Sequence, residues 1–264
     1  MRFVAVIISV YVLFIVALFV MQRTLIYFPD KSRPEPVQGA EIVKVTAQDK
    51  QELESWYFVP KDKTKPVILF FHGNAGHYGH RLYKVRDYIA AGYGVLLAEY
   101  RGYGGNSGDI SEQGFYNDGR AYISWLLSDK GVASEQIVIY GESIGSGTAV
   151  QMASEYDVAG LVLEVPFSSL LEIASQQYPF IPVKYLLKDH FMNIEKIKQI
   201  KAPLLVMHGQ KDRVIPFSSA KKLFETANKP KKFIEFPQAN HNNIYDFGAS
   251  EYVLDFLAGI RVPK

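Results

Sequence analysis

Six short apolar runs recur along the chain, and amphipathic segments separate them. They occupy residues 67–71, 94–99, 137–140, 160–164, 203–208 and 232–236. Continuous apolar runs of this length are typical of strands buried on both faces, and their alternation with helices predicts a mostly parallel sheet covered on both sides. Residues 41–46 and 51–59 instead alternate apolar and polar positions, which predicts an antiparallel pair at a sheet edge. The pattern therefore predicts an α/β fold with an eight-stranded sheet.

One connection, residues 166–201, is too long for a plain crossover helix and carries Pro166, Pro179 and Pro182. Prolines interrupt helices, so this segment is predicted to form a small lid of short helices over the carboxyl ends of the strands. Its apolar side chains serve either as core packing or as the wall of a substrate pocket. The residues that we expect to bind substrate are Phe167, Phe180, Ile181, Leu186 and Leu187.

The N-terminus is apolar over residues 3–21, where no charged residue occurs. Nineteen residues at helical rise cover roughly 28 Å, close to the thickness of a bilayer's hydrocarbon core. We therefore expect residues 1–23 to be a single-pass membrane anchor, followed by a connector over 24–40. A cleaved signal peptide is the alternative, but the apolar stretch is long for one and no small-residue cleavage site follows it. Positive charges lie on both sides of the span, so they predict no orientation.

Composition narrows the possible functions. The chain has 264 residues, 48% of them hydrophobic, which suits one domain over residues 41–264. The net charge of +2 comes without a basic stripe, so nucleic acid is not an expected partner. Disulfides and Cys-based chemistry are excluded because the chain has no cysteine. No metal or cofactor is expected, and His77 and His80 are expected to be surface groups.

The run at residues 137–140 leads into Gly141-Glu-Ser143-Ile-Gly145. In a Gly-x-Ser-x-Gly turn between a strand and a helix, the serine occupies a strained position that exposes its hydroxyl, and the glycines allow the backbone to cross closely. Ser143 is therefore the candidate nucleophile. A serine needs a base and an orienting acid to react, so the motif alone does not establish catalysis.

Candidates for those partners follow two later strands. Asp212 lies in the turn after residues 203–208, and His241 lies in the loop after residues 232–236. We expect His241 to be the base and Asp212 the acid. Glu164, at the end of an earlier strand, is the competing acid. The backbone N–H groups of Asn74 and Ile144 are the candidate oxyanion hole, because each residue lies directly beyond a strand end near the expected nucleophile.

Seven motifs spread over nearly the whole chain resemble those of the α/β-hydrolases, specifically small serine hydrolases with an N-terminal membrane anchor. They are residues 22–29, 71–76, 100–104, 141–145, 164–168, 208–212 and 240–241. The order Ser, Asp, His matches that superfamily. Some similar proteins remove fatty acyl groups from membrane-attached proteins. Glu99 departs from the pattern, where such chains usually carry Asp, and we interpret it as a structural acid.

The resemblance implies hydrolysis of an ester or thioester through an acyl-enzyme, on a lipid-like small molecule or an acylated protein. The lipid membrane is the other expected partner, through the N-terminal helix. A serine peptidase or amidase of the same fold is an alternative, because the same triad cleaves amides. A non-catalytic binding module with a vestigial site is another, since a fold does not determine function.

Overall fold

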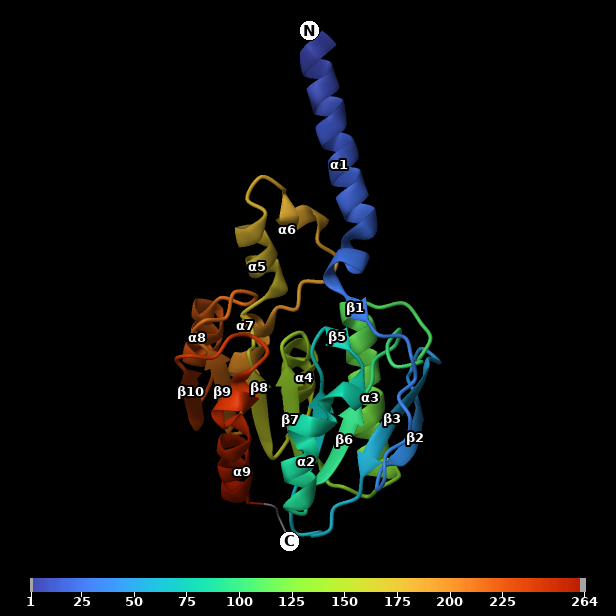
Figure 1. The fold of residues 1–264 in the computed structure, drawn as a ribbon, viewed down its shortest axis with the longest axis vertical. Helices are drawn as coiled ribbons and strands as arrows, with labels where there is room; N and C mark the ends of the chain where they lie inside the picture. Colours follow the sequence, from blue (N-terminus) through green and yellow to red (C-terminus); the bar gives the residue numbers. More distant parts are fainter. Residues whose placement is uncertain (1, 262–264) are drawn as a thin grey trace.

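A computed structural model describes residues 2–261, so Met1 and residues 262–264 of the predicted segments lie outside the described part. One mixed sheet has the strand order β10-β9-β8-β7-β4-β6-β3-β2 (Figure 1). Its strands are β2 (Glu41–Thr46), β3 (Glu52–Phe58), β4 (Val67–Phe71), β6 (Gly94–Ala98), β7 (Ile137–Glu142), β8 (Gly160–Glu164), β9 (Leu204–Gly209) and β10 (Lys231–Phe236). Among the described strands of this sheet, only the β2–β3 and β3–β6 pairs are antiparallel. The predicted α/β architecture is confirmed.

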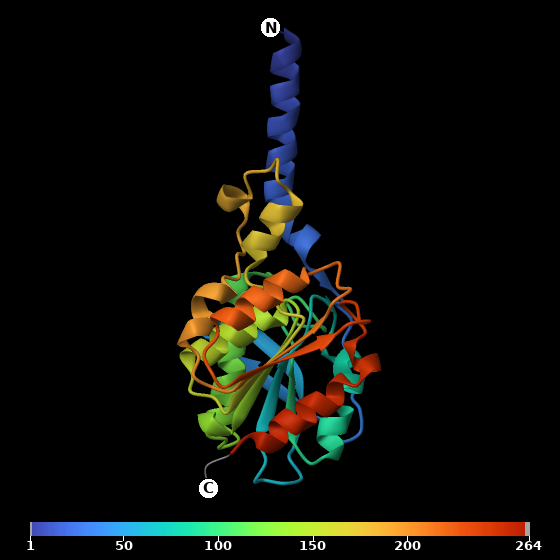
Figure 2. The same ribbon diagram turned by 90° about the vertical axis from the view of Figure 1, so that its left-hand side faces the viewer.

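The helices lie on both faces of the sheet and above its carboxyl edge (Figure 2). They are α1 (Arg2–Ile26), α2 (Leu82–Ala90), α3 (Glu112–Ser128), α4 (Gly145–Glu155), α5 (Leu170–Gln177), α6 (Val183–Leu186), α7 (Asn193–Lys196), α8 (Phe217–Thr226) and α9 (Ala249–Gly259). Short 3-10 turns add η1 (Tyr78–Arg81), η2 (Ser134–Gln136), η3 (Ile197–Gln199) and η4 (Ile244–Phe247). A small parallel pair joins β1 (Phe28–Pro29) to β5 (Ala75–Gly76).

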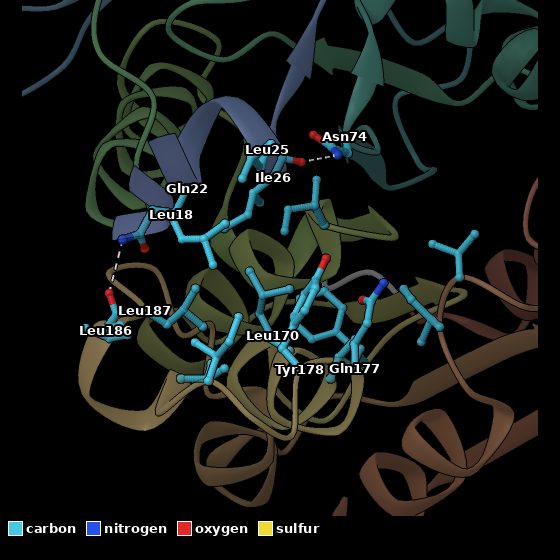
Figure 3. A pocket seen from close by; sticks show the side chains of 18 of the residues that line it. Leu18, Gln22, Leu25, Ile26, Asn74, Leu170, Gln177, Tyr178, Leu186 and Leu187 are labelled. Atoms are coloured by element: carbon cyan, nitrogen blue, oxygen red, sulfur yellow. Dashed lines mark hydrogen bonds between the residues drawn. The ribbon is translucent and has the colours of Figure 1, made fainter. Parts of the chain in front are cut away.

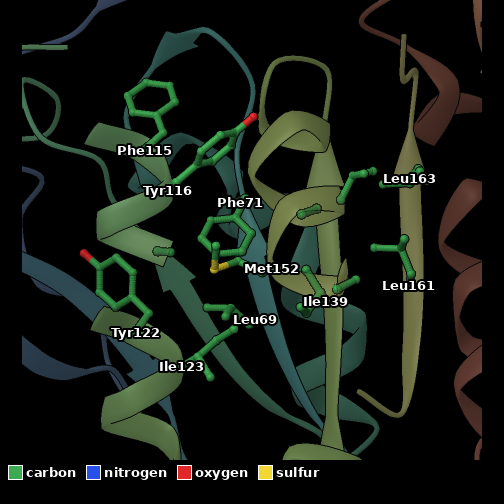
Figure 4. Packing of buried hydrophobic residues seen from close by; sticks show 14 of the residues in the cluster. Leu69, Phe71, Phe115, Tyr116, Tyr122, Ile123, Ile139, Met152, Leu161 and Leu163 are labelled. Atoms are coloured by element: carbon green, nitrogen blue, oxygen red, sulfur yellow. The ribbon is translucent and has the colours of Figure 1, made fainter. Parts of the chain in front are cut away.

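Strand β4 shows how the sheet divides the core into two layers. Val67, Leu69 and Phe71 belong to the cluster that includes α3 and α4, whereas Ile68 and Phe70 belong to the cluster that includes α2 and α9. This period of two is the side-chain alternation of a strand, with apolar residues on both faces. Figure 4 shows Leu69 and Phe71 packed beneath the side chains of α3 and α4. The sheet that carries the site is therefore packed against apolar side chains on both faces.

Helix α1 continues to Ile26, three residues past the predicted end of the anchor at residue 23. The predicted connector over 24–40 does not begin as a free segment, because Tyr27 is buried and packs edge-on against Phe115, with ring centroids 5.5 Å apart. Phe28 and Pro29 then pair with β5. Burial of the Tyr27 ring favours this packed path over a solvated linker.

Two segments lie above the carboxyl edge of the sheet: α1 and the α5–α6 part of the predicted lid (Figure 1). We call residues 169–190 the cap. Helix α7 and η3, also within the predicted lid range of 166–201, instead pack back beside α4. By length and composition α1 can cross a membrane, with a mean hydropathy of 3.1 over its most apolar stretch, and a signal sequence would share these properties.

Candidate active site

Ser143 occupies the sharp turn between β7 and α4. Its φ of +51° lies in the left-handed region, where a residue with a side chain is strained. The turn depends on two glycines: a Cβ at Gly145 would lie 2.3 Å from the carbonyl oxygen of Phe71, and one at Gly141 would lie 2.7 Å from Cα of Ser146. No side chain fits at those distances. The sequence therefore forces the strained turn that presents the Ser143 hydroxyl at the edge of the sheet.

The structure brings the three predicted triad residues together. Ser143 Oγ lies 3.1 Å from His241 Nε2, and His241 Nδ1 lies 2.7 Å from Asp212 Oδ2. The other carboxylate oxygen, Oδ1, accepts N–H bonds from Val214 at 2.8 Å and Ile215 at 2.9 Å. Burial disfavours the charge of Asp212, but His241 and these N–H groups outweigh it and hold the carboxyl pKa below its usual value. A charged carboxylate at this position favours the tautomer in which Nε2 accepts the serine proton.

Glu164, the competing acid, lies elsewhere. Its carboxylate receives Lys84 Nζ at 2.6 Å and the Tyr140 hydroxyl at 2.7 Å, and it is almost fully buried. It is therefore engaged away from the imidazole, and the structure places Asp212 against His241.

Asn74 and Ile144, the predicted oxyanion residues, line the same cavity as Ser143. Within residues 2–261, neither backbone N–H donates a hydrogen bond to a protein acceptor. Free N–H groups beside a nucleophile are what an oxyanion hole requires. The Asn74 side chain has a separate structural role, because its amide donates to the carbonyl of Ile26 and accepts from the N–H of Phe28. The loop is thereby fastened to the end of α1.

A buried pair of side chains, His72 and Glu99, supports the loop at residues 72–76, which we call the oxyanion loop after its predicted role. Glu99 Oε1 lies 2.6 Å from His72 Nε2, and Glu99 Oε2 accepts the backbone N–H of Tyr78 at 3.0 Å. Both side chains are essentially inaccessible. Glu99 therefore acts structurally, fixing the loop on which Asn74 lies.

An apolar cavity of about 390 Å³ opens beside Ser143 (Figure 3). Four of the five residues expected to bind substrate line it, namely Phe167, Ile181, Leu186 and Leu187. The prediction was wrong for Phe180, whose side chain lies at the cap tip and is 89% exposed. The sequence gives no sign of the other wall residues, which are Leu18, Phe19, Gln22, Leu25, Ile26, Phe28, Leu170, Ile173, Ala174, Gln177, Tyr178, Val183, Val214 and Ile215.

A buried charge network lies directly behind the serine. Lys84 Nζ contacts Glu142 at 3.2 Å and Glu164 at 2.6 Å, and Arg81 also binds Glu142. Burial raises the pKa of Glu164, whereas the two cations overcome burial and lower the pKa of Glu142. The two carboxylates thus share Lys84 as their common counter-ion.

We expect Lys84→Met to destabilise the protein by roughly 3–5 kcal/mol at neutral pH, because it leaves a buried carboxylate without its cation. The loss relative to wild type should shrink as the pH falls, since protonated Glu164 needs no cation. Chemical denaturation of the full-length protein in detergent measures both. Lys222→Met is the matched control: its bridge to Glu172 is exposed, so we expect a change under about 1 kcal/mol. Equal losses in the two variants would contradict the interpretation.

A second polar group forms where β1 meets β5. Asp30, His77 and His80 each offer a ligand atom, and these atoms lie within 4.8 Å of one another. His77 is buried and stacks on His80, with centroids 3.8 Å apart, so the expectation that it lies at the surface was wrong. Such a set of imidazoles and a carboxylate is of the type that binds divalent transition metals. No step of the chemistry considered below uses it.

Known proteins that resemble this chain support its fold and family. The sequence profile of the prolyl oligopeptidase family matches residues 80–258. Protein Rv2307c of Mycobacterium tuberculosis is 38% identical over 228 residues, or 84% of this chain and 81% of that protein. Protein bem46 of Schizosaccharomyces pombe is 30% identical over 260 residues, or 91% and 87%. The structure of the Pyrococcus furiosus esterase Pf2001 superposes with a TM-score of 0.72 at 18% identity, covering 89% of this chain and 99% of that one.

A mixed eight-stranded sheet with a serine in the turn after its central strand defines the class as the α/β-hydrolases. Family membership and fold together support a hydrolase. This chain belongs to the prolyl oligopeptidase family of that superfamily.

Proposed function

We propose that this protein is a serine hydrolase that cleaves carboxylic ester or thioester bonds through an acyl-enzyme. The observation that carries the proposal is the continuous hydrogen-bonded chain from Ser143 through His241 to Asp212, which opens on an apolar cavity. Three side chains distant in sequence meet in an arrangement that activates a serine. The reaction requires no cofactor.

In the first step His241 Nε2 takes the Ser143 proton as Oγ attacks the substrate carbonyl carbon. The N–H groups of Asn74 and Ile144 hold the negative oxygen, and Asp212 stabilises the imidazolium. Collapse of the tetrahedral intermediate expels the alcohol or thiol, which takes the proton from His241. Water then attacks the acyl-enzyme by the same route and releases the carboxylic acid.

The lining of the cavity supports an acyl group as the part of the substrate that it holds. Leucine, isoleucine and phenylalanine side chains dominate the wall, and a fatty chain gains about 0.8 kcal/mol for each buried methylene. We therefore propose a lipid-like small molecule or a fatty-acylated protein as substrate. The same proposal assigns α1 as the membrane anchor.

A fluorophosphonate probe tests the catalytic proposal, because it phosphonylates only an activated serine. We expect stoichiometric labelling at Ser143, identified by peptide mass spectrometry. Heat-denatured protein is the control and should not label. A folded sample that fails to label would instead support the binding-module alternative.

A peptide bond is the second candidate for the bond that this protein cleaves. The name of the matching family, prolyl oligopeptidase, favours it. The geometry of the triad and oxyanion residues suits both an ester and an amide bond. The two candidates therefore differ only in the leaving group, which is an alcohol for the ester and an amine for the amide. Turnover of an N-acyl amino acid nitroanilide, compared with that of the nitrophenyl ester of the same acid, separates the two. We expect the ester to be strongly preferred, and efficient turnover of the anilide would favour a peptidase.

A further inference from the structure

The last turns of α1 form one wall of the cavity that contains Ser143. Leu18, Gln22 and Leu25 face the cap residues across this space, and Ile26 reaches the oxyanion loop (Figure 3). A helix that served only to attach the domain to a membrane would have no reason to line the candidate site. Here the same segment is both apolar enough to cross a bilayer and part of the pocket.

Specific polar contacts dock α1 onto the cap. The Gln22 amide donates to the Leu186 carbonyl at 3.1 Å and accepts the Lys188 N–H at 2.7 Å. Arg23 makes a bidentate ion pair with Asp189, in which Nε lies 2.9 Å from Oδ2 and Nη2 lies 3.0 Å from Oδ1. Asp189 is almost fully buried. A bidentate pair of this kind fixes orientation as well as distance. These contacts fix the position of α1 against the cap, and so they fix the wall of the cavity that α1 forms.

The burial of side chains along α1 distinguishes this face from the others. Ile15, Leu18, Gln22 and Ile26 are buried or partly buried, and they follow one another at intervals of three, four and four. Such spacing places them on a single stripe of the helix. The remaining positions of residues 3–21 are almost all apolar and exposed, as expected for a surface that meets lipid.

The cap contacts α1 over a length that matches the thickness of one leaflet of a bilayer. Tyr11 donates its hydroxyl to the carbonyl of Phe180 at the cap tip, at 2.8 Å. Tyr11 and Gln22 are about 17 Å apart along a helix, close to the roughly 15 Å of one leaflet's hydrocarbon. With α1 across a bilayer, the cap therefore reaches into the adjacent leaflet. Its exposed aromatic residues, Tyr185 and Phe180, suit that environment.

We propose that α1 and the cap together form a lateral port that takes a fatty acyl chain directly from the adjacent leaflet into the cavity. The substrate class is a long-chain ester or thioester whose chain lies in the bilayer and whose carbonyl reaches Ser143. The inference rests on the proposed hydrolase function. It adds that the anchor helix is part of the substrate-binding site and that entry is from lipid.

The first test uses a substitution in α1 that narrows the port. Leu18→Trp fills the cavity, and Val20→Trp is the matched control on the same helix, at a position that is 69% exposed and outside the cavity lining. The full-length variants are reconstituted in phosphatidylcholine vesicles with nitrophenyl acetate or nitrophenyl palmitate. Loss of only two buried methylenes costs about tenfold. We therefore expect Leu18→Trp to lower the ratio of kcat/KM for palmitate to kcat/KM for acetate at least about tenfold, while Val20→Trp leaves this ratio at its wild-type value.

An unchanged palmitate-to-acetate ratio in Leu18→Trp, or an equal fall in Val20→Trp, would overturn the port. Wild-type protein that hydrolyses neither ester would instead defeat the hydrolase proposal itself. If Leu18→Trp loses acetate turnover through misfolding, cross-linking of the wild-type protein tests whether α1 lines the acyl-binding cavity. A fluorophosphonate with a long chain ending in a diazirine should join Ser143 to residues 18–26, and cross-links confined to the cap or to lipid would reject the α1 wall.

The direction of entry has its own test. Palmitate ester embedded in the same vesicles as the protein should be hydrolysed several-fold faster than the same ester supplied in separate vesicles. Equal rates in the two arrangements would show entry from water and overturn the lateral route. Nitrophenyl acetate, which dissolves in water, serves as the control and should show no difference.

Discussion

Replacing Ser143 with alanine is expected to reduce kcat/KM towards nitrophenyl acetate by about 10⁴-fold or more. The proposed reaction forms its covalent intermediate on Ser143 Oγ, and the imidazole 3.1 Å away then has no hydroxyl to deprotonate. Initial-rate kinetics on the purified full-length protein measure the effect. Any residual rate would come from the oxyanion N–H groups and from binding alone.

The matched control for this substitution is Ser154→Ala, on the same helix α4. Its hydroxyl only donates back to the carbonyl of Gln151 at 2.7 Å, so we expect wild-type turnover. Comparable thermal melting of both variants would exclude unfolding as the cause of any loss. Undiminished ester hydrolysis by Ser143→Ala would reject the nucleophile assignment and with it the proposed mechanism.

Asp212→Asn is expected to lower kcat by roughly 10⁴-fold while preserving the fold. The N–H groups of Val214 and Ile215 hold one carboxylate oxygen, so the amide oxygen should take that position. The amide NH₂ then faces His241 Nδ1 and must donate to it. The imidazole is left with its proton on Nε2, where it cannot accept one from Ser143.

Glu164→Gln is the comparison that separates the two candidate acids. Glu164 binds Lys84 and Tyr140, not the imidazole, so turnover per active site should remain close to that of wild type. Titration of active sites with a fluorophosphonate corrects for any unfolded fraction. A large fall in kcat for Glu164→Gln with little effect of Asp212→Asn would reverse the assignment.

Most of the sheet could be predicted because its strands carry local signals. Apolar runs bounded by glycine or proline mark β4, β7 and β9, and the strained turn at Ser143 needs two glycines at fixed positions. The relation of Asp212 to His241 could also be anticipated, since both follow parallel strands that end at the same edge of the sheet.

Contacts between distant segments could not be predicted in this way. The docking of α1 rests on Gln22 and Arg23 meeting the cap more than 160 residues later, and a uniformly apolar helix gives little sign of which face is covered. Phe180 was misplaced for a related reason. A proline-interrupted segment has no single periodicity from which the direction of a side chain can be derived. Asp30 meets His77 only through the pairing of β1 with β5.

The packing of Tyr27 and β1 immediately after α1 has a mechanical consequence. Because α1 leads directly into this packed segment, with α1 in a bilayer the Ser143 hydroxyl is held at a fixed height above the membrane surface. Such an arrangement lacks the reach of a domain on a flexible tether. A lipidated protein would have to present its acyl bond at that height, and bonds farther from the membrane surface would escape cleavage whatever their chemistry.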